Sequence, residues 1–282
     1  MKQKTNDNDS SEAAALAAAT IHQNELVYST WFSSVLWLHD ANHKIHSIPA
    51  LPHGLEFVVF LFGYAFNPVS IPVWMAIMAL AGAVPASMVN GEEDTSTMDS
   101  TEALLFPPAF YLATVLVTLA GTELCKAIFR ATRPEALLSK ETTKLIVRRY
   151  GTLVASLKSK HSFPSGDSAQ AANAVLFYYY YVTPKLWMLL QQQSSSALPT
   201  LEWTTSPLPL LLLHVFALYV FYPGVAFARI FYHCHWIEDT LGGGLLALVL
   251  HSTVIPTVSN LAWIAVHSIY VNYLSQFLER IF

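Results

Sequence analysis

Several stretches of this chain are apolar over about 20 consecutive residues, the length of α-helix that crosses the hydrocarbon core of a bilayer. These stretches are residues 69–89, 104–124, 168–190, 207–227 and 240–258, with a weaker candidate at 261–278. Because a backbone inside a bilayer must satisfy its own hydrogen bonds, such stretches fold as helices. The sequence therefore predicts an all-α, polytopic membrane helical bundle with about six transmembrane helices.

The composition agrees with a membrane protein and excludes other classes. Hydrophobic residues make up 54% of the chain and charged residues only 12%, whereas about a quarter of a soluble protein is charged. The formal net charge of −4 gives no basic field that would hold nucleic acid by its phosphates. Cys125 and Cys234 are too few for a disulfide scaffold and are interpreted as free thiols.

The chain divides into four segments. Residues 1–25 are polar and then Ala-rich, without the apolar core of a secretory signal, and are predicted to form a disordered tail. Residues 26–54 begin with a short amphipathic stretch and are predicted to lie at the membrane interface. Residues 55–260 hold the main apolar stretches and form the transmembrane domain, and residues 261–282 are predicted to form a C-terminal membrane or interfacial helix.

The alternation of the spans places two basic loops on one face of the membrane. These loops are residues 126–167 and 228–239, and they carry ten of the fifteen Lys and Arg residues of the chain. Residues 145–157 repeat apolar side chains at helical spacing between basic ones. This pattern is typical of an amphipathic helix on anionic headgroups, and equally of a solvated helix that packs on the protein itself.

Polar stretches at the ends of the spans on this face have a spacing that suits anion binding. Lys126 precedes Arg133 by seven residues, so on a continuing helix both cations lie on one face, and Pro134 then stops the helix. Ser165 and Gly166 open the next span and so lie at a helix N-terminus. The backbone N–H groups there bind anions, and glycine allows a close approach.

A third stretch supplies Arg229, His235 and Asp239. The last two are four residues apart, so on one helical face the carboxylate can orient the imidazole and stabilise its charged form. Together with the other cations, these residues suit phosphoryl transfer to a histidine, followed by hydrolysis of the phosphohistidine by water. No cofactor or metal is expected, because the His233-Cys234-His235 run lacks further ligands at the usual spacing.

The same stretches resemble the signature of the type 2 phosphatidic acid phosphatase superfamily, the integral membrane lipid phosphate phosphatases. The residues that match its three motifs, in order, are Lys126, Arg133, Pro134, Pro164, Ser165, Gly166, Arg229, His235 and Asp239. The resemblance covers roughly residues 50–260. Soluble vanadium-dependent haloperoxidases share the signature, but the membrane composition argues against that class. The chain departs from the pattern at Asp167, where the family has its second histidine, and at Ala228, which replaces a serine.

The resemblance implies a role for each matched polar residue. Lys126, Arg133, Arg229, Ser165 and Gly166 bind the substrate phosphate, His235 is the nucleophile, and Asp239 orients it. The missing family histidine protonates the leaving oxygen, which leaves three alternatives. Asp167 is protonated once substrate is bound, or His161 or His233 acts as the acid, or the leaving group needs little help.

The implied function is metal-independent hydrolysis of a phosphatidic acid-like lipid phosphate through a phosphohistidine. Alternatives are an isoprenoid diphosphate phosphatase, a lipid phosphotransferase, and a non-catalytic membrane protein that binds lipid phosphates. The expected partners are the lipid phosphate substrate and membrane lipids. By resemblance to eukaryotic members, the site faces the lumen or the outside, in the endoplasmic reticulum or plasma membrane, whereas the excess of Lys and Arg in the basic loops predicts a cytoplasmic face.

Overall fold

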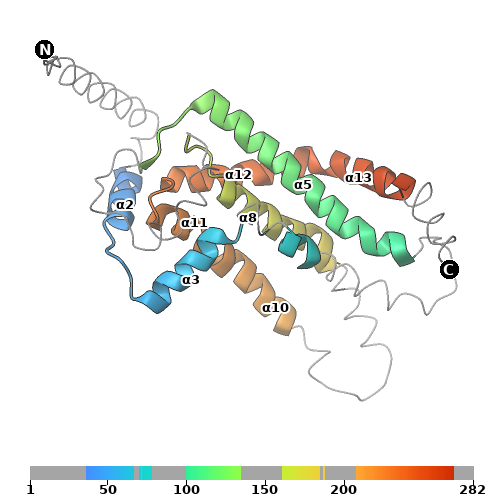
Figure 1. Cartoon of the computed structure of the whole chain (residues 1–282), viewed down its shortest axis with the longest axis horizontal. Coiled ribbons are helices and arrows are strands. Elements are labelled where there is room, and N and C mark those ends of the chain that lie inside the picture. Colours follow the sequence, from blue (N-terminus) through green and yellow to red (C-terminus); the bar gives the residue numbers. More distant parts are fainter. Residues whose placement is uncertain are drawn as a thin grey trace, which may run out of the picture.

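The computed structural model describes residues 36–66, 70, 72–77, 100–134, 161–184, 187 and 208–269, and every element in these ranges is helical (Figure 1). The α-helices are α2 (Leu36–His46), α3 (His53–Tyr64), α5 (Ser100–Phe129), α8 (Gly166–Phe177), α10 (Leu208–Val215), α11 (Tyr222–Phe231), α12 (Ile237–Thr253) and α13 (Ile255–Ile269). Two π-helical turns, Tyr178–Val182 and Phe216–Phe221, extend α8 and join α10 to α11. The predicted all-α fold class is confirmed.

Two helical stretches in the described part are long and apolar enough to cross a membrane, Phe106–Phe129 and Leu211–Phe231. They coincide with the predicted spans at 104–124 and 207–227. A third crossing results if α12 and α13, which are bent by 62° at their junction, form one broken span. The bend lies at Val254 and is followed by Pro256, so the boundary predicted near residue 258 lies a few residues too late. The total of six spans stays a prediction.

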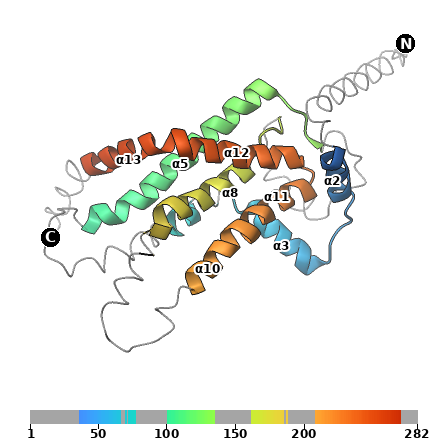
Figure 2. The same cartoon turned by 180° about the vertical axis from the view of Figure 1, so that it is seen from behind.

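α8 lies inside the bundle, where α5, α11 and α12 pack around it (Figures 1 and 2). Its alanines at positions 169, 171, 172 and 174 are buried, and such small side chains allow helices to approach closely in lipid. α13 runs alongside α5, and α3 lies against α11. Leucines on the outer faces, such as Leu116 of α5 and Leu245 of α12, are exposed, as expected of a surface that faces lipid.

Three consecutive glycines on α12 contact three different neighbours. A Cβ atom on Gly243 would lie 2.5 Å from the carbonyl oxygen of Ser165 and 3.0 Å from the backbone nitrogen of Ala169, both at the start of α8. Cβ atoms on the flanking Gly242 and Gly244 would collide with the side chains of Phe163 and Tyr222. The glycine run therefore sets how closely α12 packs against α8, the loop before it, and α11.

A buried hydrogen-bond network joins three helices in the middle of the bundle. The Asn173 side chain donates to Thr114 Oγ1 at 3.1 Å, and its Oδ1 atom lies 2.8 Å from His251 Nε2. All three residues are buried. Nε2 of His251 is thus bound by a neighbouring helix, and such bonds stabilise helix association in membranes.

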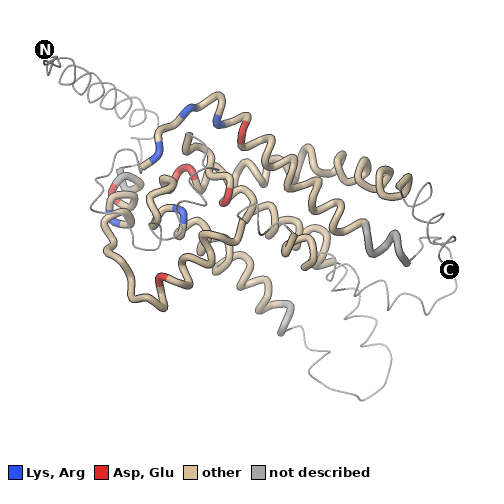
Figure 3. Tube along the Cα trace, in the orientation of Figure 1, with Lys and Arg blue, Asp and Glu red and all other residues tan. Residues whose placement is uncertain are grey.

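Charged residues of the described part gather at one end of the bundle, near α2, while the opposite half is uncharged apart from the first turn of α5 (Figure 3). The residues at this end are Asp40, Lys44, Glu56, Glu123, Lys126, Arg130, Arg133, Asp167, Arg229, Glu238 and Asp239. The predicted tail 1–25, the first ten residues of the interfacial segment, the basic stretch 135–160, the loop 191–206 and residues 270–282 lie outside the described residues.

Candidate active site

Lys126 lies in the last turn of α5 and is largely buried, with 8% of its surface exposed. Its Nζ atom donates to Glu123 Oε1 at 2.6 Å. A Cβ atom on Gly166 would lie 3.7 Å from the same Nζ atom, so the ammonium group lies beside the first residue of α8. The structure thus brings a cation to the helix N-terminus that the sequence marked as an anion site.

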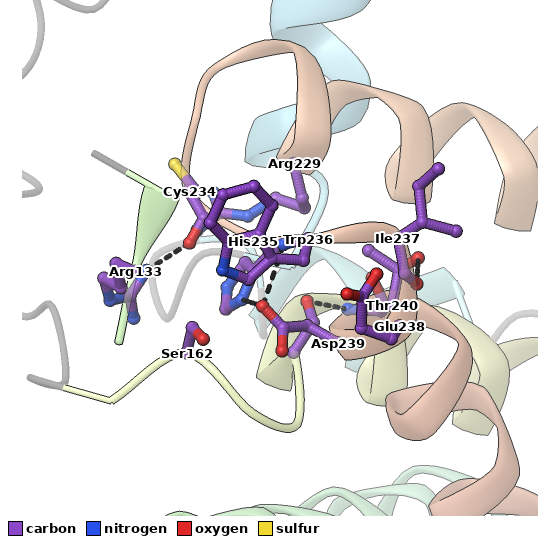
Figure 4. Close-up of polar contacts among 12 residues, drawn as sticks. Arg133, Ser162, Arg229, Cys234, His235, Trp236, Ile237, Glu238, Asp239 and Thr240 are labelled. Atoms are coloured by element: carbon purple, nitrogen blue, oxygen red, sulfur yellow. Dashed lines mark hydrogen bonds and ion pairs between the residues drawn. The ribbon is translucent and has the colours of Figure 1, made fainter. Parts of the chain in front are cut away.

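Arg133 reaches the site by a different route from the predicted one. α5 ends at Phe129, where Arg130 adopts a left-handed backbone conformation with φ of 50°, and Arg133 follows outside any helix. The prediction that Lys126 and Arg133 share one helical face is therefore wrong. The Arg133 guanidinium instead donates to the carbonyl oxygen of Cys234 at 3.0 Å, next to His235 (Figure 4).

Ser165 begins α8 as predicted and ties it to α12. Its hydroxyl accepts a hydrogen bond from the backbone N–H of Ser168 as the helix N-cap. Its own backbone N–H donates to the carbonyl oxygen of Asp239 at 2.9 Å. Since Ser165 is fully buried, the N-terminus of α8 and the first turn of α12 form one unit.

His235 lies in the short loop between α11 and α12. His233, with φ of 55°, ends the turn after α11, and the N–H groups of Cys234 and His235 donate to the carbonyl oxygen of Arg229 at 3.0 and 3.2 Å. The prediction that His235 and Asp239 share a helical face is wrong in its geometry, because His235 precedes α12. The two side chains nevertheless meet, since Asp239 is in the first turn of that helix.

The carboxylate of Asp239 lies next to the imidazole of His235 (Figure 4). Its Oδ2 atom is 3.5 Å from His235 Nδ1 and accepts the backbone N–H of Trp236 at 2.8 Å. At this distance the two groups are close enough for an electrostatic interaction, but Nδ1 makes no hydrogen bond to any described residue. Because Nδ1 faces the carboxylate, Nε2 is the ring nitrogen that remains to react.

Burial lowers the pKa of His235 well below its ordinary value of 6.5. The nearby cations Arg229, Arg133 and Lys126 lower it further, against the opposing effect of Asp167. A lowered pKa favours the neutral imidazole, which is the nucleophilic form. The role of Asp239 in stabilising a charged imidazole stays a prediction.

Asp167 forms an ion pair with Arg229. The distance from Asp167 Oδ2 to Arg229 Nε is 2.8 Å, and 25% of the Asp167 side chain is exposed. The Arg229 guanidinium also donates to the carbonyl oxygen of Gly63 at 3.4 Å.

The two other candidate acids are placed differently. The Nδ1 atom of His233 lies 3.0 Å from Nδ1 of His46 in α2, so this atom of His233 is engaged on the α2 side of the loop. His161 lies five residues before α8, ahead of the loop that ends at Ser165.

Sequence reasoning missed Glu123, Asn42 and His46. Glu123 precedes Lys126 by three residues, a helical spacing at which opposite charges pair, so the pattern would have identified it. Asn42 and His46 contact the loop around His235 from α2, nearly 200 residues away in the chain, and no local pattern links them. Among the described residues, no three His, Cys, Asp or Glu side chains are grouped so that they would hold a metal ion.

Comparison with known proteins gives one match. The family model of the PAP2 superfamily matches residues 107–263, which is more than half of the chain and includes every matched motif residue. Neither the curated proteins nor the solved structures give a match.

Proposed function

The chain belongs to the PAP2 superfamily, whose members are phosphatases, and from this premise we propose that it hydrolyses a lipid phosphate through a phosphohistidine. The observation that carries the proposal is the burial of the His235 imidazole beside a carboxylate and three cations. Its Nδ1 atom faces Asp239, and Lys126, Arg133 and Arg229 lie close enough to act on its charge. Such an arrangement suits attack on a phosphate whose oxygens are held by cations.

The reaction follows in two steps. Nε2 of His235 attacks the phosphorus, the bond from phosphorus to the leaving oxygen breaks, and Asp239 stabilises the positive charge that develops on the ring. Water then attacks the phosphohistidine and releases inorganic phosphate, which restores the neutral imidazole. Neither step calls for a metal ion.

The substrate that we propose first is a phosphatidic acid-like phosphate monoester. The Asp167–Arg229 ion pair favours a second candidate, a lipid diphosphate such as an isoprenoid diphosphate. The carboxyl group of Asp167 is already engaged by Arg229, and the phosphate that leaves from a diphosphate is a far weaker base than an alkoxide and needs little protonation.

Phosphate release from the purified full chain in detergent, with EDTA present, tests this proposal. We expect release from phosphatidic acid or from a polyprenyl diphosphate, loss of that release in His235→Ala, and full activity in His53→Ala, a control at the exposed start of α3. Release that depends on a divalent metal contradicts the mechanism.

The same assay separates the remaining alternatives. If the phosphate is transferred to an added alcohol in preference to water, the protein is a phosphotransferase. If it binds lipid phosphate without releasing phosphate, it is a non-catalytic binding protein.

A further inference from the structure

α2 packs against the loop that carries His235 and against the start of α12. This helix, Leu36–His46, lies outside the part of the chain that matches the PAP2 superfamily. Its inner residues Asn42 and His46 are each only 5% exposed. A short polar helix that buries an amide and an imidazole against a catalytic loop calls for an explanation beyond apolar packing.

Asn42 caps α12 from outside. The residue at the N-cap position of α12 is Trp236, whose indole has a donor and no acceptor, so it cannot bind the free N–H groups of the first turn. Asn42 Oδ1 accepts the N–H of Ile237, the first residue of α12, at 2.9 Å. Its Nδ2 atom donates to Glu238 Oε2 at 2.7 Å. An amide from another helix thus takes the role of the usual N-cap side chain.

His46 holds the other side of the same loop. Its ring stacks on that of His233 with centroids 5.0 Å apart, and their Nδ1 atoms are 3.0 Å apart, so one ring donates a hydrogen bond to the other. The ring also meets Trp236 edge-on at 5.1 Å. His233 has the left-handed backbone that turns the chain toward His235, a conformation that is costly for a residue other than glycine.

The residues that α2 contacts lie on both sides of His235 in the sequence. α2 binds His233 and Trp236, which flank the segment of the nucleophile, and Ile237 and Glu238 in the turn that also carries Asp239. Side chains accept hydrogen bonds from two successive backbone N–H groups at the start of α12. Trp236 N–H is accepted by Asp239, and Ile237 N–H by Asn42. The relative position of the imidazole and its carboxylate therefore depends on α2.

We propose that α2 is a positioning element of the active site, in which Asn42 and His46 hold the loop of His235 in register with Asp239. This inference rests on the proposed function, because it assigns a purpose to the position of the nucleophile. Neither residue is assigned a contact with substrate. Their loss should therefore lower kcat while KM and the binding of phosphate stay nearly constant.

The test compares full-length variants in detergent. We expect Asn42→Ala to lower kcat by about tenfold to a hundredfold and to change KM and the inhibition constant of inorganic phosphate by no more than about twofold. His46→Phe, which keeps the ring contact but loses the hydrogen bond, should lower kcat less than His46→Ala. His43→Ala, an exposed position on the same helix, is the matched control and should keep wild-type kinetics.

A pair of substitutions that exchanges the donor and the acceptor of the Asn42–Glu238 hydrogen bond should restore kcat. Asn42→Asp alone places two carboxylates together at the start of α12, so kcat should fall. Combined with Glu238→Gln, the new aspartate accepts from both Ile237 and the glutamine, and we expect most of the lost kcat to return. A double variant no better than Asn42→Asp contradicts the proposed contact.

Hydrogen–deuterium exchange provides a readout that does not need activity. Asn42→Ala should raise exchange in the peptide that spans residues 232–240. Unchanged kcat in Asn42→Ala overturns the inference, and so does a fall in kcat that comes with a matching loss of phosphate binding. If the wild-type protein releases no phosphate, the proposed function fails and the exchange result alone decides whether α2 holds this loop.

Discussion

Two carboxylates accompany the cations of the candidate site. Asp167 pairs with Arg229 at 2.8 Å, and Glu123 pairs with Lys126 at 2.6 Å. Glu123 is 53% exposed, so water screens its contact, whereas the Asp167 pair is mostly enclosed. If the proposed function holds, a bound phosphate shares Arg229 with Asp167, and we expect substitutions of Asp167 to change substrate choice.

Substitutions of Asp167 separate the two proposed substrates. Asp167→Asn removes the anion that competes for Arg229, and we expect it to spare hydrolysis of a polyprenyl diphosphate. Asp167→His restores a side chain that donates a proton near neutral pH, so kcat/KM on phosphatidic acid should rise by about 100-fold, at the lower end of general acid catalysis. Steady-state kinetics on both lipids provide the measurement.

The opposite result is equally clear. Suppose that Asp167→Asn abolishes both activities while His161→Ala and His233→Ala leave them intact. Asp167 would then be the general acid when substrate is bound. The proposal that a diphosphate substrate reacts without a general acid would fail.

Helix positions are more predictable from this sequence than helix ends. The apolar run at 104–124 and the small polar pair Ser165-Gly166 before the next apolar stretch indicated α5 and the start of α8, because span length is a local property. The left-handed residues Arg130 and His233 end the helices at the site. Arginine does not signal a positive φ, and histidine adopts one too seldom to predict it. The contacts of α2 depend on distant residues and leave no local pattern.

The packing of α12 on α8 gives a prediction at the scale of elements. Gly243→Ala adds a methyl group 2.5 Å from the backbone of Ser165, so α12 must move away from the anion-binding end of α8. We expect a loss of about 1–3 kcal/mol in stability, measured by thermal unfolding in detergent, and a fall in activity. Gly54→Ala, where nothing lies within 4 Å, is the control and should leave both unchanged. A Gly243→Ala protein as stable and active as the wild type would contradict this account of the packing.

The site lies at one end of the whole bundle, and the side of the membrane that this end faces is a property of the entire topology. The expectation from the family is a luminal or extracellular site, while the excess of cations in the loop predicts the cytoplasm. The predicted alternation of spans would put residues 135–160 on the same side as the site and residues 191–206 on the other.

We propose the luminal or extracellular orientation and expect cysteine labelling to support it. In a chain with Cys125 and Cys234 replaced by alanine, a Thr143→Cys residue in the endoplasmic reticulum should resist an impermeant maleimide in cells whose plasma membrane alone is permeabilised. Ser194→Cys, in the opposite loop, should be labelled under the same conditions. In a plasma-membrane protein the Thr143→Cys residue should be labelled in intact cells. The reversed pattern would place the site in the cytoplasm.

Charge gathers at one end of an otherwise apolar bundle (Figure 3). This placement also determines which substrate concentration governs the rate. A substrate whose tails stay in the bilayer reaches this end by moving within a two-dimensional sheet. The quantity that fills the site is then the mole fraction of that lipid among its neighbours, rather than its amount per volume of water. Adding inert lipid at a fixed total of substrate would slow turnover, and a membrane region enriched in the substrate would speed it, with no change in the protein.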